Sequence, residues 1–125
     1  MAEPPELPGD LTAAVRALSV ADVLAFGGVG LAGQVLPPTA AYQAVEAALP
    51  QRAADVRPGL DWLLDHGSPA GRAYAATLLG RIDPAAGAAA WRSLRREPAT
   101  FTSFFGCLMG QETLGEYAAR QLDEG

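Results

Sequence analysis

The chain has 125 residues, a length typical of a single domain, and half of them are hydrophobic. Much of that half is alanine, which has the highest helix propensity, so the composition favours helix over sheet. The formal net charge of -5 disfavours general attraction to nucleic acid or anionic lipid, because both need a basic surface.

The composition also points to a compartment and a source. The chain has one cysteine, which excludes an internal disulfide framework and a multi-cysteine metal site and fits a reducing compartment. All nine basic residues are arginine, as is typical of proteins from GC-rich bacterial genomes. We therefore expect a bacterial, cytoplasmic protein.

The first third predicts a leader and short helices. Residues 1–10 are acidic and rich in proline, and we expect a flexible leader before one helical domain over 11–125. Asp10 is placed to cap a helix through Leu18. Ser19 then caps a second helix over 20–26, or the two helices run on as one. The apolar stretch 20–36 contains Asp22 and four glycines and is too short to span a membrane.

The middle of the chain predicts a helix that restarts at Thr39 and ends before Pro50. The following segment 51–66 contains Pro58-Gly59, so it forms either two pieces or one helix whose firm part begins at Pro58. Trp62 and Leu63 are expected to face the core, and Gly67 to end the helix.

Two similar helix starts follow, each a capping residue before a proline. Ser68-Pro69 begins a helix whose apolar stripe is Ala75, Leu78, Leu79 and Ile82, and Asp83-Pro84 begins a helix that extends to about Arg96. Residues 99–110 are the least helical part, either extended or a packed loop. Thr113 and Glu116 form a capping box that starts the last helix.

No series of strands is visible, so the predicted fold is all-α, a compact bundle of antiparallel helical hairpins. The segment 68–96, beginning "SPAGRAYAATLLGRIDPAAGAAAWRSL", resembles a HEAT-type helical-repeat unit. It has an early arginine, small residues before a Leu-Leu pair, and a tight Asp-Pro turn before a second helix. The resemblance implies a HEAT-like second half that presents a binding surface and performs no reaction.

Two motifs invite an enzymatic interpretation. "GVGLAG", Gly28–Gly33, matches G-x-G-x-x-G, but Pro37-Pro38 prevents the long helix that a dinucleotide site needs, so we expect an interhelical turn. His66 lies between Asp65 and Ser68, yet sequence neighbours do not generally point at one another as a catalytic triad requires. A histidine at a helix C-terminus is the simpler interpretation.

Cys107 has apolar neighbours, and we expect it to be a small buried hydrophobic residue. We predict no catalytic residue, no metal site and no cofactor. The alternative is a small enzyme or ligand-binding protein that uses a pocket between helices near Cys107 and His66.

One local group of basic residues is a candidate partner-binding surface: Arg81, Arg92, Arg95 and Arg96. Arginine forms bidentate contacts with carboxylates and suits recognition of a protein partner. An ordinary solvated face, partly neutralised by Asp83 and Glu97, is the alternative.

The favoured hypothesis is a small helical protein-interaction or regulatory module that inhibits or scaffolds a protein partner, with no membrane or nucleic-acid ligand. A third hypothesis is structural, a homodimer held by an apolar cluster. Its residues are Phe101, Phe104, Phe105, Leu108 and Met109.

Overall fold

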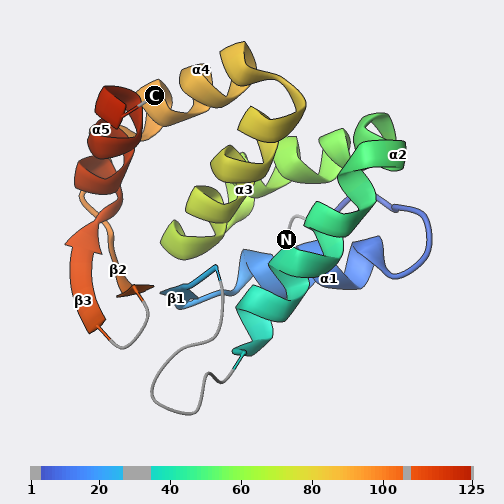
Figure 1. Ribbon diagram of the computed structural model, residues 1–125, viewed down its shortest axis with the longest axis horizontal. Helices are drawn as coiled ribbons and strands as arrows, with labels where there is room; N and C mark the ends of the chain where they lie inside the picture. The colour runs from blue at the N-terminus through green and yellow to red at the C-terminus, as the bar shows by residue number, and fades with distance from the viewer. Residues whose placement is uncertain (1–3, 27–34, 106–107, 125) are drawn as a thin grey trace.

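The computed structural model describes residues 4–26, 35–105 and 108–124. This part of the chain forms five helices and a small sheet (Figure 1). The helices are α1 (Leu11–Ser19), α2 (Pro37–His66), α3 (Pro69–Ile82), α4 (Pro84–Leu94) and α5 (Leu114–Glu124). The strands are β1 (Val23–Leu24), β2 (Thr100–Phe105) and β3 (Leu108–Thr113). The predicted all-α class is confirmed in outline, because the described chain is mostly helical; the small three-stranded sheet was not predicted.

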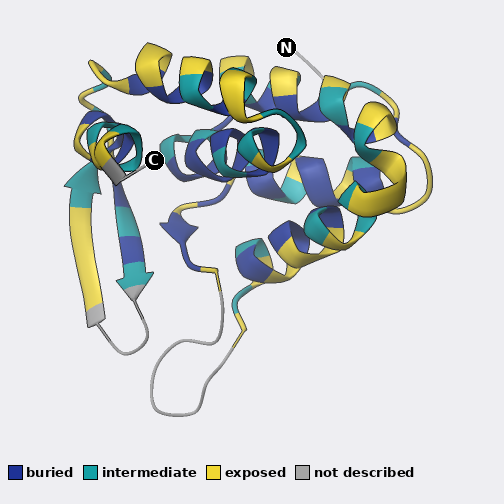
Figure 2. Ribbon diagram, turned by 45° about the horizontal axis from the view of Figure 1, so that its top comes forward, coloured by how far each residue is buried: buried dark blue, intermediate teal, exposed yellow. Residues whose placement is uncertain are grey.

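Helix α3 is the centre of the fold. It packs against α1, α2, α4, α5, β1 and β2, and most of its own residues are buried (Figures 1 and 2). Tyr74 and Leu78 of α3 are fully buried, and Leu79 is nearly so. The predicted apolar stripe of this helix therefore faces the core.

Both predicted helix starts in the second half are confirmed. The Ser68 hydroxyl accepts a hydrogen bond from the Gly71 N–H (3.1 Å), and Pro69 is the first residue of α3. One carboxylate oxygen of Asp83 accepts hydrogen bonds from the N–H groups of Ala85 and Ala86. Asp83 is also the only residue between α3 and α4, so the hairpin turn and the cap are the same residue.

The start of α1 departs from the prediction at its cap. Asp10 precedes α1, but its side chain makes no capping hydrogen bond. Instead the Thr12 hydroxyl accepts a hydrogen bond from the N–H of Leu7 and donates one to its carbonyl. Leu7, which lies in the segment predicted as a leader, is buried in the core.

The predicted second helix over 20–26 is wrong. Ser19 is the last residue of α1, and its hydroxyl donates a hydrogen bond to the Arg16 carbonyl (2.6 Å). The chain then extends into β1, where Val23 pairs with Thr102 of β2. Pairing with a strand from the far end of the sequence decides the conformation here, and local propensity does not.

The helix predicted to end before Pro50 continues beyond it, and α2 is interrupted only at the second residue after that proline. Arg52 has non-helical dihedrals, with φ at -129° and ψ at 25°. Pro50 lies just before the break, where its missing N–H and its ring disfavour a continuous helix. The second part contains Pro58 and ends at Gly67, whose N–H donates to the Leu63 carbonyl (2.8 Å). The predicted stop at Gly67 is confirmed.

The sheet has the order β1-β2-β3, with β1 parallel and β3 antiparallel to β2. Phe101 and Ser103 are buried, whereas Thr102 and Phe104 of the same strand are partly exposed. This alternation is that of a half-buried strand. The segment 99–110, predicted to be extended or a packed loop, contains all of β2 and the start of β3.

Helix α5 begins at the predicted capping box. The Thr113 hydroxyl accepts a hydrogen bond from the Glu116 N–H (3.1 Å) and donates one to the Glu116 carboxylate (2.9 Å). Thr113 is also the last residue of β3. The change from strand to helix therefore takes place at a single threonine.

Candidate functional site

The four predicted binding arginines do not form one cluster. Arg81 lies in the last turn of α3 and forms an ion pair with Glu46 of α2. Arg92 lies in the last turn of α4, at the end of the helix that is far from Asp83. This helix has eleven residues and is about 16 Å long. Since α3 and α4 join at Asp83, the length of α4 separates Arg81 from the other three.

Arg92, Arg95 and Arg96 form what we call the terminal arginine cluster. All three are exposed, and none forms an ion pair with another residue in the part of the chain that the structure describes. Four other arginines each pair with a carboxylate: Arg57, Arg72, Arg81 and Arg120. The three cations also lie at the C-terminal end of α4, where the helix dipole favours positive charge.

The two carboxylates expected to neutralise this cluster are engaged elsewhere. Asp83 lies 3.5 Å from the Arg57 guanidinium and also caps α4. Glu97 lies 3.5 Å from the Arg72 guanidinium. The terminal arginine cluster therefore keeps its positive charge on a chain whose net charge is negative.

His66 is not part of a catalytic triad in this structure. It is the exposed last residue of α2, and its ring lies 5.4 Å from that of Trp62. The Ser68 hydroxyl is already used, because it donates to the Ala21 carbonyl (2.5 Å) and accepts from the Gly71 N–H. The expected position of His66 at a helix C-terminus is confirmed.

The remaining motif residues lie outside the described residues. These are the glycine-rich segment Gly28–Gly33 and Cys107. Within 4–26, 35–105 and 108–124, no group of three or more histidine, cysteine, aspartate or glutamate side chains is arranged to hold a metal ion.

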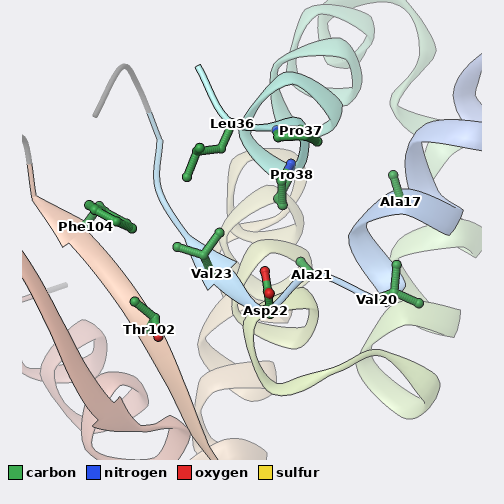
Figure 3. Close-up of a pocket in the computed structure, with 10 residues that line it drawn as sticks. All are labelled: Ala17, Val20, Ala21, Asp22, Val23, Leu36, Pro37, Pro38, Thr102 and Phe104. Atoms are coloured by element: carbon green, nitrogen blue, oxygen red, sulfur yellow. The ribbon is translucent and has the colours of Figure 1, made fainter. Parts of the chain in front are cut away.

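A surface pocket of about 570 Å³ lies where the end of α1, β1, the start of α2 and β2 meet (Figure 3). Its lining is mostly apolar: Ala17, Val20, Ala21, Asp22, Val23, Leu36, Pro37, Pro38, Thr102 and Phe104. Asp22 is the one ionisable side chain among these residues. The lining thus offers no acid–base pair, and His66 lies at the opposite end of α2.

A buried hydroxyl network beside this pocket was not predicted from the sequence. The Tyr74 hydroxyl donates to the Ala25 carbonyl and accepts from the Ala25 N–H, both at 2.8 Å. The Thr39 hydroxyl donates to the same carbonyl (2.7 Å). Three segments that are distant in the sequence therefore meet at Ala25, and no local sequence pattern predicts this contact.

The tyrosines of this region serve structure and are poorly suited to proton transfer. Burial raises the pKa of the Tyr74 hydroxyl above its ordinary value. Burial, together with the charge of Glu46, raises the pKa of Tyr42 to about 12. Both hydroxyls stay protonated near neutral pH, and the Tyr74 hydroxyl donates its proton in a hydrogen bond to the Ala25 carbonyl.

Comparisons with other proteins assign the chain to no family or functional class. No protein-family model, curated protein or solved structure matches the chain. None of the helices in the described residues is both long and apolar enough to cross a membrane. The fold and its surface are therefore the basis for a functional proposal.

Proposed function

We propose that the chain is a small helical interaction module, bacterial and cytoplasmic, that binds an acidic segment of a partner protein and inhibits or scaffolds that partner. The observation that carries this proposal is the terminal arginine cluster: three exposed guanidinium groups without a carboxylate partner among the described residues. Each can bind a carboxylate with two parallel hydrogen bonds.

The α3–α4 hairpin supports the proposal as a rigid base for this surface. Its sequence resembles a HEAT-type unit, and helical-repeat units of that kind commonly present binding surfaces. The core face of α4 is anchored by Trp91 and Leu94, which are buried, whereas Arg92, Arg95 and Arg96 remain outside. Binding through side chains on such a base requires no cofactor or metal.

The test is a charge reversal with a matched control. A partner is first isolated from the source organism with the immobilised chain, and its affinity is then measured by calorimetry with purified proteins. We expect R92E/R96E to weaken binding about tenfold or more, chiefly through a slower association that depends on salt. The control R16E/R52E makes the same change of charge at two exposed arginines that also lack an ion pair with a described residue.

Both double variants are expected to fold, because exposed charges contribute little to stability. Equal affinities of the wild-type chain and R92E/R96E would refute the assignment of the terminal arginine cluster. An equal loss of affinity in the control would mean that net charge, and not this cluster, governs binding.

The pocket favours a second candidate function, binding of a small apolar ligand. Its volume falls within the usual range for small-molecule sites, about 300 to 1,000 Å³. Nile red, a neutral apolar dye, is a suitable probe. We expect V20D, which places a charge in the pocket lining, to abolish a saturable fluorescence increase that V35D, at another exposed valine, retains. Absence of saturable binding by the wild-type chain would exclude this candidate.

A further inference from the structure

Strand β3 is an open edge of the sheet. The sheet order is β1-β2-β3, so β3 has β2 on one side and, among the described residues, no strand on the other (Figure 1). Met109, Gly110 and Gln111 are exposed, with 68% of the Met109 surface accessible. An exposed edge strand presents main-chain groups that can pair with another strand.

The register shows which main-chain groups point outward. The Leu114 N–H donates to the Ala99 carbonyl (2.8 Å), which marks these two residues as a hydrogen-bonded pair. Hydrogen-bonded and non-hydrogen-bonded pairs alternate along an antiparallel ladder. Met109, opposite Phe104, and Gln111, opposite Thr102, are therefore non-hydrogen-bonded positions. Their N–H and C=O groups point away from β2.

We propose that β3 pairs antiparallel with β3 of a second copy of this chain, about a twofold axis at Gly110. Met109 then exchanges both hydrogen bonds with Gln111 of the second copy, and Gln111 does the same with Met109 of the second copy. The four outward groups of Met109 and Gln111 in each strand are satisfied by an identical strand. This self-complementarity is the reason for choosing a second copy over an unrelated segment.

The side chains of β3 permit this pairing. Gly110 carries no side chain at the axis, and the space beside its Cα is open. The Glu112 charge is already compensated, because its carboxylate forms an ion pair with Arg120 and accepts a hydrogen bond from Ser103 (3.0 Å). The two strands thus meet without an uncompensated like charge and without the lysine or proline that often protects an edge.

Dimerisation also removes apolar surface from water. The two Met109 side chains lie on the same face of the joined sheet as diagonal neighbours, a distance within reach of long side chains. The opposite edge of each sheet is β1, which has only two residues. Growth by repeated strand addition is therefore disfavoured, and a closed dimer is expected. The interface does not use the terminal arginine cluster and is independent of the proposed function.

The first experiment measures oligomeric state by sedimentation velocity on the full chain over about a hundredfold range of concentration. We expect a concentration-dependent dimer. Q111P removes an outward N–H and should abolish it, whereas Q111A keeps the main chain intact and should dimerise like wild type. A chain that is monomeric throughout, a dimer that survives Q111P, or a dimer that Q111A also abolishes would overturn the proposal.

The second experiment does not depend on the proline variant folding. In a C107S background, G110C places two cysteines across the proposed axis, where the Cα atoms of a non-hydrogen-bonded pair lie about 4.5 Å apart. We expect rapid disulfide-linked dimers under mild oxidation. The control Q43C, at an exposed site on α2 in the same background, should cross-link slowly. Equal rates for the two cysteines would contradict the interface.

Discussion

At the scale of a single residue, the Tyr74 hydroxyl joins α3 to Ala25, the residue to which Thr39 of α2 also bonds. Tyr74→Phe removes both its bonds to Ala25 and leaves a buried N–H without its partner. We expect the free energy of unfolding to fall by about 1–3 kcal/mol, the usual cost of an unsatisfied buried group. Urea denaturation followed by circular dichroism measures this change.

The matched control for that substitution is Tyr42→Phe. Among the described residues the Tyr42 hydroxyl bonds only to the partly buried Glu46 carboxylate (3.1 Å), so its removal leaves no described backbone group unsatisfied. A smaller loss, below about 1 kcal/mol, is expected. If both variants lost the same stability, the hydrogen bonds between Tyr74 and Ala25 would not contribute more to stability than the bond between Tyr42 and Glu46.

The same tyrosines predict instability at high pH. In the unfolded chain a tyrosine ionises near pH 10, whereas burial raises the pKa of Tyr42 to about 12 in the folded chain. Between these values the unfolded state binds fewer protons, so the free energy of unfolding decreases as pH rises. We expect the urea midpoint to be lower at about pH 11 than at about pH 9, and to decline less in Tyr42→Phe. A midpoint that stays constant over this interval would contradict the assignment.

At the scale of elements, α3 and α4 are in close contact at two glycines that are not equivalent. A Cβ added to Gly87 would lie 2.4 Å from the Gly80 Cα, whereas one added to Gly80 would lie 3.8 Å from the Gly87 Cα. Gly87→Ala should therefore lower the free energy of unfolding by about 1–3 kcal/mol through overpacking. Gly80→Ala should leave it unchanged or raise it by up to about 1 kcal/mol, since alanine favours helix.

These two variants carry the same added methyl group and differ only in where it lies. Thermal denaturation of both, beside wild type, compares them directly. The hairpin geometry would be wrong if Gly80→Ala proved to be the more damaging change.

At the scale of the whole molecule, the contacts of α3 with elements on both sides predict one cooperative unfolding transition. Trp62 in α2 and Trp91 in α4 report on two different helices that pack against α3. In W62F and W91F a single tryptophan remains, and we expect its fluorescence transition to coincide with the loss of helix seen by circular dichroism. Separate midpoints for the two halves would show that α3 does not couple them.

The sequence allowed prediction where neighbouring residues determine the structure. Ser68 with Pro69, and Thr113 with Glu116, act within a single turn, so their caps could be recognised from spacing alone. The sheet could not be recognised in this way, because β1 has only two residues. It is extended because it pairs with Thr102 and Ser103, far along the chain. A two-residue strand leaves no periodicity to detect.

The candidate site was predicted in part for the same reason. The positions of Arg92, Arg95 and Arg96 at the end of one helix followed from local pattern. That these arginines have no nearby carboxylate partner could not be predicted, because it depends on the contact of Glu97 with Arg72 on another helix. Likewise the apolar pocket combines residues from α1, β1, α2 and β2, whose proximity is a property of the tertiary structure.

The single-residue connection at Asp83 has a consequence for how this chain tolerates changes of length. An α-helix turns by about 100° per residue, so one residue inserted after Asp83 would rotate the inward side of α4 by about that angle relative to α3. Gly87 would leave its contact with Gly80, and Trp91 would turn toward solvent. Substitutions in the exposed parts of this hairpin are therefore tolerable, while insertions and deletions at its turn are not.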